Sequence, residues 1–574
     1  MKAQGSATAK VKKHPTGLYV LFLTEMWERF GYYLMLGIFS LFMLDSWDNG
    51  GMGFDPATKS DIYGTYIGLV YLTPFIGGLL ADRILGYRLS IIIGGLLMSA
   101  GYFGLSLHGE TPFYISLLLI IVGNGFFKPN ISTMVGNLYN NDTYRKNKDA
   151  GFNIFYMGIN IGAFVCNFVA AYMRNNWGWG SAFIVAGVGM LVGLAIFLIG
   201  TKHIKEADVI KPTQEGDMSL LKIFGIVLVP MFVFGFIGYI IPGSIFGSDT
   251  TDAFVLGCLP VIGFFVNLLM KASAEDKRPI GALLAVYTCI IIFWAVFHQN
   301  GDALTVWAED HTDRGLPAWI AEPAQSVGMA QVTNYDPSVS WPEDQYKTFR
   351  DDLVTRRDAK KAAKDKLAAK AIGKELKIRD DSRNYFKNLP EAERPEKGQD
   401  LLLASTELFQ SINPFWVVLL TPLVVGLFGF MRRKGNEPST PAKILLGLVI
   451  TALSTLVMFA AVKATDLDTE KASSMWLIGA YAVITFGELC LSPMGLSLVS
   501  KLSPPRITAL MMGGFFLSTA LGNKLAGSLS GLWEGFEDKS YFFLMNFGLV
   551  MVAAAMLFFM LKWLNAVMKE KNIH

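Results

Sequence analysis

The strongest chemical signal in the sequence is a cluster of charged residues inside an apolar segment near the N-terminus. The segment contains the run EMWERFGYY, which includes Glu25, Glu28 and Arg29. This spacing places the three side chains on one face of a helix, with acid before base as an intrahelical pair prefers. Each ionised group near the bilayer centre costs about 2.5–3.5 kcal/mol, so these groups must face protein or water. Two interpretations remain open: a buried ion-pair network between helices, and a site where a proton exchanges with a salt bridge.

Two further charged residues lie far apart in the sequence, each near a proline within an apolar segment. The run GNGFFKPNIS contains Lys128 before Pro129, and the run FGELCLSPMG contains Glu488, Ser492 and Pro493. A proline breaks the helical hydrogen-bond ladder, which a membrane span tolerates where it lines a cavity or packs on protein. Lys128 requires an anion, either an internal carboxylate or that of a ligand. Together with Glu488 it matches the two ends of a zwitterion; the alternative is that Glu488 is protonated and hydrogen-bonded within a helix bundle.

Apolar helices must position these residues. The chain has 574 residues, of which 52% are hydrophobic and only 17% charged. Segments of roughly 20 apolar residues recur along it, long enough for a helix to cross a hydrocarbon core of about 30 Å. We count about fourteen such segments and expect an all-α polytopic membrane protein. The expected spans are 18–44, 62–81, 88–108, 113–137, 151–173, 179–200, 220–243, 253–271, 279–299, 412–431, 441–462, 473–499, 507–531 and 541–565.

The short loops between these spans predict the orientation of the chain. Lys and Arg gather on one side, including the basic N-terminus and the loops at 145–148 and 432–434, whereas Asp45 and Asp48 lie in a loop on the other side. Because cytoplasmic loops carry the basic excess, both termini are predicted to be cytoplasmic. Residues 1–17 are polar and basic and do not resemble a cleavable signal peptide. We expect a multi-pass protein of the cell inner membrane, in contact with membrane lipid.

One long segment, residues 301–411, interrupts the series of spans and is predicted to lie in the periplasm. Its middle is rich in Ala, Lys, Glu and Leu, which favours a solvated helix. Acidic residues are interspersed among its basic ones, so an exposed soluble helix is favoured over a surface for nucleic acid or acidic lipid. We expect either a helical cap or an element that binds a periplasmic partner.

Several classes of function lack support in the sequence. The net charge of +3 is spread over loops, which does not indicate nucleic-acid binding. The four cysteines lie within apolar segments without metal-type spacing. We find no nucleophile triad, zinc-protease motif or phosphate-binding loop, so we expect neither an enzyme, nor a metal site, nor a cofactor.

The chain resembles the proton-dependent oligopeptide transporter (POT) family of the major facilitator superfamily. Besides the charged runs above, the matching motifs read YLTPFIGGLLADRILGYR, FNIFYMGINIGA, FWAVFHQ, INPFW and MMGGFFLSTALGNKLAG. They extend from residue 25 to about residue 530 and leave only the predicted outer insertion uncovered.

This resemblance implies a major facilitator fold of two six-helix bundles with two extra helices between them. The corresponding divisions are residues 1–200, 201–277 and 278–574. It also implies a symporter that imports di- and tripeptides with protons by alternating access. The alternative keeps the fold but carries another small solute, such as nitrate, an amino acid or a peptide-like compound.

The resemblance also assigns roles to residues. Proton coupling is expected at Glu25, Glu28 and Arg29, with the proton as coupling ion. Substrate is expected to contact Tyr33, Tyr71, Lys128, Tyr156 and Asn160 in the first half, and Trp294, Asn413, Glu488 and Ser492 in the second. The carboxylate of the peptide is expected near Lys128 and its amino group near Glu488.

Three positions depart from the family pattern. Leu36 replaces a usual arginine and His298 replaces a usual acid, so the outer gate pair expected in the family is missing. Three roles remain open for His298: a substitute gate with Asp302 and Lys524, titration in its own right, and a plain hydrogen-bonded histidine. Phe515 replaces a tryptophan and is expected to reshape one wall of the pocket.

Overall fold

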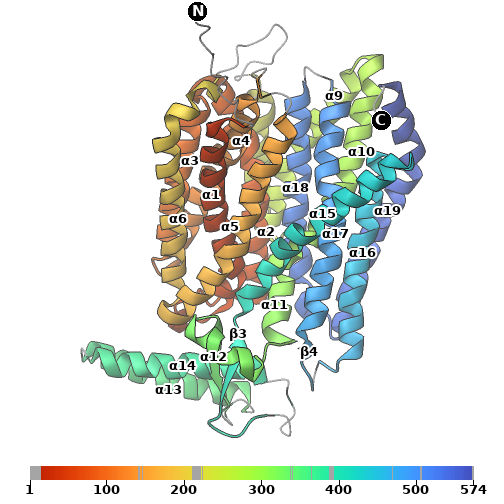
Figure 1. The fold of residues 1–574 in the computed structure, drawn as a ribbon. Helices are drawn as coiled ribbons and strands as arrows, with labels where there is room; N and C mark the ends of the chain where they lie inside the picture. Colours follow the sequence, from red (N-terminus) through yellow and green to blue (C-terminus); the bar gives the residue numbers. More distant parts are fainter. Residues whose placement is uncertain are drawn as a thin grey trace, which may run out of the picture.

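A computed structural model describes residues 14–139, 143–144, 147–209, 222, 224–335, 338, 341–363, 365–386, 389, 394–467, 469–504 and 507–571. Long helices dominate the fold (Figure 1). The first group comprises α1 (Thr16–Leu44), α2 (Pro56–Leu80), α3 (Tyr87–Leu105), α4 (Glu110–Leu138), α5 (Lys148–Trp177) and α6 (Trp179–Ile199). Then follow the π-helical η6 (Phe224–Leu228), α8 (Val229–Ile240) and α9 (Asp249–Lys271). The last group comprises α10 (Ala274–Phe297), α15 (Ile412–Arg433), α16 (Thr440–Ala464), α17 (Ser474–Leu502), α18 (Thr508–Gly531) and α19 (Lys539–Glu570).

Shorter elements connect these helices. They are η1 (Trp47–Asn49), the π-helical η2 (Ala81–Leu85), η4 (Gly200–His203), η5 (Lys205–Ala207), η7 (His298–Gly301), α11 (Ala303–Asp310) and η12 (Trp533–Gly535). Between α11 and α15 lie β1 (Thr312–Asp313), α12 (Ala318–Ser326), β2 (Ala330–Asn334), α13 (Glu343–Ala362), α14 (Lys366–Phe386), β3 (Asp400–Ala404) and η10 (Thr406–Ser411). Strand β2 pairs antiparallel with β3, and β1 pairs in parallel with β4 (Ala472–Ser473).

The expected spans correspond closely to the long helices. Within the described residues, eleven helices are long and apolar enough to cross a membrane. The other three expected spans correspond to α1, α18 and α8. Helices α1 and α18 are long enough to cross a membrane but are less apolar or more charged than those eleven helices, and α8 has only 12 residues. The polytopic all-α fold is therefore confirmed, although the boundaries shift by several residues.

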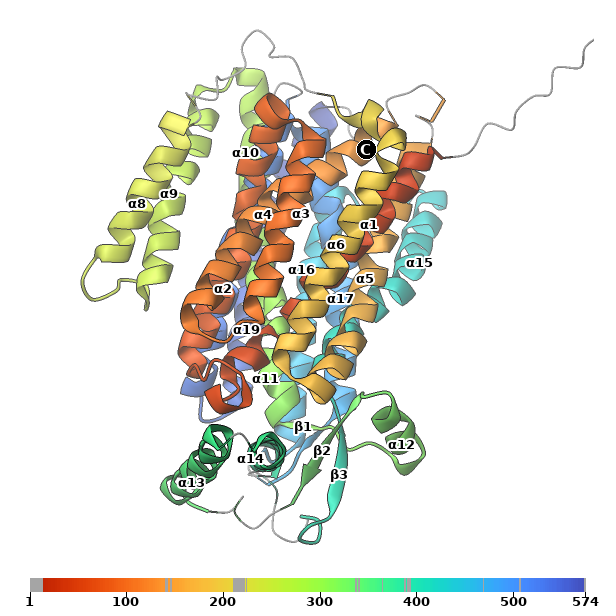
Figure 2. The ribbon, with the colours of Figure 1, turned by 90° about the vertical axis from the view of Figure 1, so that its left-hand side faces the viewer.

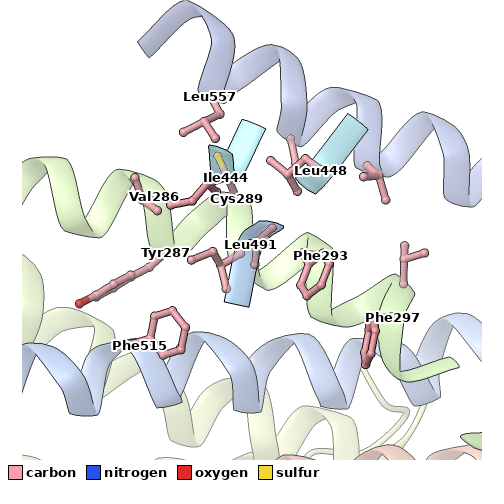
Figure 3. Packing of buried hydrophobic residues seen from close by; sticks show 14 of the residues in the cluster. Val286, Tyr287, Cys289, Phe293, Phe297, Ile444, Leu448, Leu491, Phe515 and Leu557 are labelled. Carbon is pink, nitrogen blue, oxygen red and sulfur yellow. The ribbon is translucent and has the colours of Figure 1, made fainter. Parts of the chain in front are cut away.

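Two large apolar cores divide the helices into two bundles. One core is formed by α1 to α6, including the buried rings of Phe39, Tyr66 and Phe113. The other is formed mainly by α9, α10 and α16 to α19; Figure 3 shows Phe293 and Leu491 within it. The pair α8–α9 stands to one side of the bundles (Figure 2). Each bundle therefore has its own close-packed apolar core.

Helices α2 and α18 connect the two bundles through glycines. A Cβ atom on Gly64 would lie 2.8 Å from the Cα of Gly527 and 2.9 Å from the carbonyl oxygen of Lys524. No side chain fits there without separating the helices, because real Cβ atoms do not approach backbone so closely.

We expect Gly64→Leu to lower stability by at least about 1–3 kcal/mol, the usual cost of overpacking. The measurement is thermal unfolding of the purified protein in detergent. The matched control is Gly426→Leu on α15, where an added Cβ meets nothing within 4 Å. Equal melting temperatures for the two variants would contradict the close packing of α2 on α18.

The residues between α11 and η10 form a compact insertion on one face of the molecule, opposite the face where α1 begins and α19 ends (Figures 1 and 2). We call these the insertion face and the terminal face. Two long helices, α13 and α14, occupy the region where the composition predicted solvated helix. The insertion also starts later than residue 301, because α10 continues through η7 and α11 to Asp310.

Candidate functional site

The three charged residues of α1 form one buried cluster. Glu25, Glu28 and Arg29 are at most 2% exposed. Arg29 donates from Nη2 to Oε1 of Glu28 at 2.7 Å, and its Nε contacts the other Glu28 oxygen and lies 3.4 Å from Oε1 of Glu25. Within the described residues, Oε2 of Glu25 has no hydrogen-bond partner. The cluster thus holds two carboxylates against one guanidinium, which leaves one carboxylate oxygen available for a proton or another cation.

Lys128 of α4 lies at the centre of a row of aromatic contacts that reaches the second bundle. Its Nζ is 3.9 Å from the ring centre of Tyr71 on α2, and its charge acts on both Glu25 and His298. The Tyr71 and His298 rings are 5.9 Å apart, and His298 stacks on Trp294 at 4.8 Å. Lys128 is therefore placed between the acidic cluster of α1 and the aromatic side chains of α10.

Glu488 of α17 supplies the opposite charge from the second bundle. Asn413 of α15 donates to Oε2 of Glu488 at 3.3 Å and to Oγ1 of Thr485 at 2.8 Å. The carboxylate of Glu488 acts electrostatically on Tyr33 and Tyr156 of the first bundle. Glu488 of the second bundle is therefore close enough to Tyr33 and Tyr156 of the first bundle for its charge to affect them.

Several polar groups of this region retain unused hydrogen-bonding capacity. Within the described residues, Nε1 of Trp294 and Oγ of Ser492 have no partner. Tyr156, in the first third of α5, is 47% exposed, so open space borders its ring. Asn160, by contrast, donates to the backbone oxygen of Tyr156 at 3.0 Å, and its amide nitrogen is thus engaged within α5. No group of three His, Cys, Asp or Glu side chains suited to a metal occurs in the described part of the chain.

The three departures from the family pattern lie in different surroundings. Leu36 packs against the core of the first bundle. Phe515 is only 4% exposed, and its ring meets that of Tyr287 edge-on with centres 6.1 Å apart (Figure 3). Its side chain therefore packs into the second core. His298 has no partner at Nδ1 within the described residues, so it is not a simple hydrogen-bonded histidine at that atom.

The suggested substitute gate of His298, Asp302 and Lys524 is wrong, because its two charged members belong to separate ion pairs. Asp302 contacts the ammonium group of Lys59 on α2, and both side chains are at most 3% exposed. Ser40 of α1 donates to the backbone oxygen of Gly301 at 2.7 Å and reaches Asp302 at 3.3 Å. These contacts join the first bundle to the end of α10 at the insertion face.

Lys524 of α18 instead pairs with Asp61 of α2. Its Nζ lies 2.5 Å from Oδ1 of Asp61 and donates to Thr65 at 2.6 Å. Ser248 and Thr250, at the start of α9, also donate to Asp61. One carboxylate therefore links both bundles and the extra helix pair.

A third ion pair joins the bundles near the insertion. Arg174 of α5 lies 3.2 Å from Glu407 of η10, with both side chains at most 4% exposed. Asn167 of α5 donates to Oγ of Ser411 at 3.1 Å. Every ion pair that we find between the two bundles among the described residues lies at the insertion face, which is therefore the closed face. Sequence analysis did not single out Lys59, Asp61 or Arg174, because charged residues near the ends of spans are normally solvated.

We expect Lys59→Ala to destabilise the protein by about 3–5 kcal/mol, because Asp302 would remain buried without a cation. Thermal unfolding in detergent measures this effect. The double variant Lys59→Met with Asp302→Leu removes both charges and should recover most of the loss. A single variant as stable as the double variant would show that the pair is not buried.

These features define a multi-pass membrane protein with opposite charges on two helix bundles that meet at one closed face. The POT family model matches residues 88–320 and 401–557. The chain is 30% identical over 540 residues to the uncharacterized transporter YclF of Bacillus subtilis, covering 92% of this chain and 90% of that protein. It is 28% identical to the di-/tripeptide transporter of Lactococcus lactis subsp. cremoris, covering 92% and 91%.

Solved structures show the same relationship. A crystal structure of a mutant peptide transporter in complex with alafosfalin superposes with a TM-score of 0.72 at 26% identity, covering 97% of this chain and 96% of the other. The chain belongs to the POT family and has the major facilitator fold.

Proposed function

We propose that this protein is a proton-coupled symporter that imports di- and tripeptides by alternating access. The observation that carries the proposal is the placement of Lys128 and Glu488, which present opposite charges from different bundles. A peptide zwitterion has a carboxylate and an ammonium group that match these two charges. The di-/tripeptide transporter of Lactococcus lactis, to which the chain is 28% identical, supports the choice of substrate.

The site residues take specific roles in this proposal. Lys128 binds the peptide carboxylate, and Glu488, held by Asn413, binds the amino group. Tyr33, Tyr71, Tyr156 and Trp294 surround the peptide, and Ser492 donates to it. Asn160 holds the backbone of α5 at Tyr156 and contributes less directly.

Proton coupling follows from the position of Lys128 near both Glu25 and the peptide. When Glu25 is ionised, it attracts Lys128 and competes with the peptide carboxylate. Protonation of Glu25 removes that competition, while Arg29 remains held by Glu28. The proton therefore favours peptide binding, and the two bundles rock around a site near the middle of the membrane.

We further propose how the chain is oriented in the membrane. Residues 1–200 and 278–574 form the two moving bundles, and residues 201–277 contribute the extra helix pair. Both termini lie in the cytoplasm, so the insertion face is the periplasmic face of an inner membrane protein. The closed insertion face then corresponds to an inward-facing state. The protein is not an enzyme and uses the proton as its coupling ion without a further cofactor.

The decisive experiment is uptake of labelled dialanine by proteoliposomes that contain the purified protein. We expect accumulation when the outside is more acidic than the inside, and only slow equilibration without a gradient. Competition by tripeptides, free amino acids and nitrate identifies the substrate class. Block by nitrate or free amino acids, without block by peptides, would overturn the proposal in favour of another solute.

A further inference from the structure

The insertion contacts the first bundle at one short loop, η1. Asp48, in η1 directly after α1, accepts hydrogen bonds from two arginines of α13. Arg350 reaches Oδ2 at 3.2 Å, and Arg357 reaches Oδ1 at 2.9 Å and the backbone oxygen of Asp48 at 2.9 Å. Arg357 is only 6% exposed. Two guanidinium groups thus hold a carboxylate and a carbonyl of the same residue, a strong geometry for a contact at the protein surface.

A second carboxylate, from α14, completes this contact. Asp380 accepts from Tyr346 of α13 at 2.9 Å, from Nε of Arg350 at 3.3 Å, and from Asn49 of η1 at 3.2 Å. Burial raises the pKa of the Asp380 carboxyl, and Arg350 and Tyr346 oppose that rise. The helix pair α13–α14 and the η1 loop therefore share one connected network of charges.

The other side of the insertion is fixed to the second bundle. Strand β1 pairs with β4, which directly precedes α17. Lys471 contacts the backbone oxygen of Asp310, and its ammonium lies 5.0 Å from the ring centre of Tyr385 on α14. Trp307 of α11 is fully buried against the rings of Trp533 and Phe543.

The insertion therefore lies across the line where the two bundles meet on the insertion face (Figures 1 and 2). Besides the η1 loop, it touches the end of α5, where Asn175 donates to the backbone oxygen of Gly328 at 2.9 Å and to Ser405 at 2.7 Å. The insertion is continuous in the chain with α11 at its start and with α15 at its end, and both elements belong to the second bundle. If the bundles separate at this face, the insertion therefore stays with the second bundle, and its contacts to the first bundle break.

We propose that the helix pair α13–α14 is a clasp that moves with the second bundle and holds the insertion face closed through Asp48. The inference rests on the alternating-access function proposed above. In this protein the clasp supplements the ion pairs of Lys59 and Asp61, at a face where the family's outer gate pair is replaced by Leu36 and His298. Releasing the clasp increases the population of the state that is open at the insertion face.

The first test releases the clasp by the double substitution Arg350→Ala with Arg357→Ala. Opening is read as the labelling rate of Leu36→Cys by a membrane-impermeant thiol reagent added at the insertion face. Leu36 lies one turn before Ser40, whose contact with Gly301 closes this face, and the native cysteines are buried. We expect labelling to accelerate about fivefold, which is a shift of about 1 kcal/mol.

The matched control is Arg356→Ala, because Arg356 is an exposed neighbour whose ion pair within the described residues is with Asp352 of its own helix. We expect its labelling rate to equal that of the parent. An unchanged rate in the double variant, with unaltered thermal stability, would overturn the clasp. Because labelling needs no peptide, this result is independent of whether the protein transports dialanine.

The second test locks the clasp. Asp48→Cys with Arg357→Cys is joined by a short bifunctional thiosulfonate in proteoliposomes, and uptake is measured before and after reduction. We expect at least a tenfold loss of uptake on cross-linking and recovery on reduction. The control pair, Asp352→Cys with Arg356→Cys, lies one turn apart on α13 and should leave uptake unchanged. Full uptake by the cross-linked 48–357 pair would show that the insertion moves with the first bundle and would reject the proposal.

Discussion

We expect gradient-driven peptide uptake to fall at least about 30-fold when Lys128 is replaced by alanine. Removing one partner of a buried charge pair costs about 2–5 kcal/mol, and each 1.4 kcal/mol is a factor of ten. Lys128 lies 3.9 Å from the ring centre of Tyr71 and near Glu25 and His298, so in the proposed mechanism its loss removes the cation that binds the peptide carboxylate and responds to the charge of Glu25. The measurement is dialanine accumulation in proteoliposomes under an inward proton gradient.

The control for this substitution is Lys434→Ala, because Lys434 is exposed beyond the end of α15. Its uptake should match that of the parent protein. Lys128→Arg keeps the charge but changes its shape and should retain partial uptake. Undiminished accumulation by Lys128→Ala would remove the basis of the proposed function.

Substituting Glu25→Gln should separate transport from proton coupling. The amide resembles a protonated carboxyl group that cannot release its proton, so Lys128 would remain free for peptide. We expect gradient-driven accumulation to fall about 10–100-fold, the contribution typical of a positioned proton-transfer group. Exchange of labelled for unlabelled dialanine across the membrane, which needs no net proton movement, should persist.

The comparison between the two assays decides the role of Glu25. Loss of both accumulation and exchange would indicate a structural role in the cluster with Arg29, which was the alternative interpretation of the sequence. Retention of both accumulation and exchange would show that a residue other than Glu25 couples transport to the proton. Glu110→Gln, at the first turn of α4 on the insertion face, is the control for a carboxylate outside the cluster.

The fold was largely predictable because a membrane restricts the possible structures. A run of apolar residues in lipid must be a helix, and its length is set by the bilayer. The ends of α6 and α15 accordingly agree with the expected spans to within two residues, whereas α5 and α19 extend several residues further. Those extensions carry polar residues outside the apolar run, where hydropathy gives no signal.

Three residues of the candidate site could be singled out in the sequence for a different reason. Charges at mid-membrane depth are costly, so Glu25, Lys128 and Glu488 were conspicuous without any structure. The partners of Lys59 and Asp61 were not, since each pair joins residues more than two hundred positions apart in sequence. Charged residues at the ends of spans are ordinary in sequence. Only the packing of α2 on the second bundle shows that Lys59 is buried and Asp61 partly buried.

The middle of the insertion was predicted as a solvated helix from its composition, and α13 and α14 agree with that prediction. Its attachment was not predicted. In the sequence, Asp48 is one acidic loop residue among several, yet its carboxylate accepts hydrogen bonds from both Arg350 and Arg357. A run of charged surface residues in a sequence rarely shows which of them form ion pairs in the fold. Exposed ion pairs stabilise a protein only slightly, so many pairings are nearly equal in free energy.

The insertion also has a practical consequence for imaging. Compact transporters surrounded by detergent offer few features from which electron micrographs can be aligned, because the helices lie within the micelle. Here a folded mass with two long helices stands beyond one end of the bundles (Figure 2). That asymmetric projection distinguishes top from bottom in each particle, and an antibody fragment raised against α13 would enlarge the landmark.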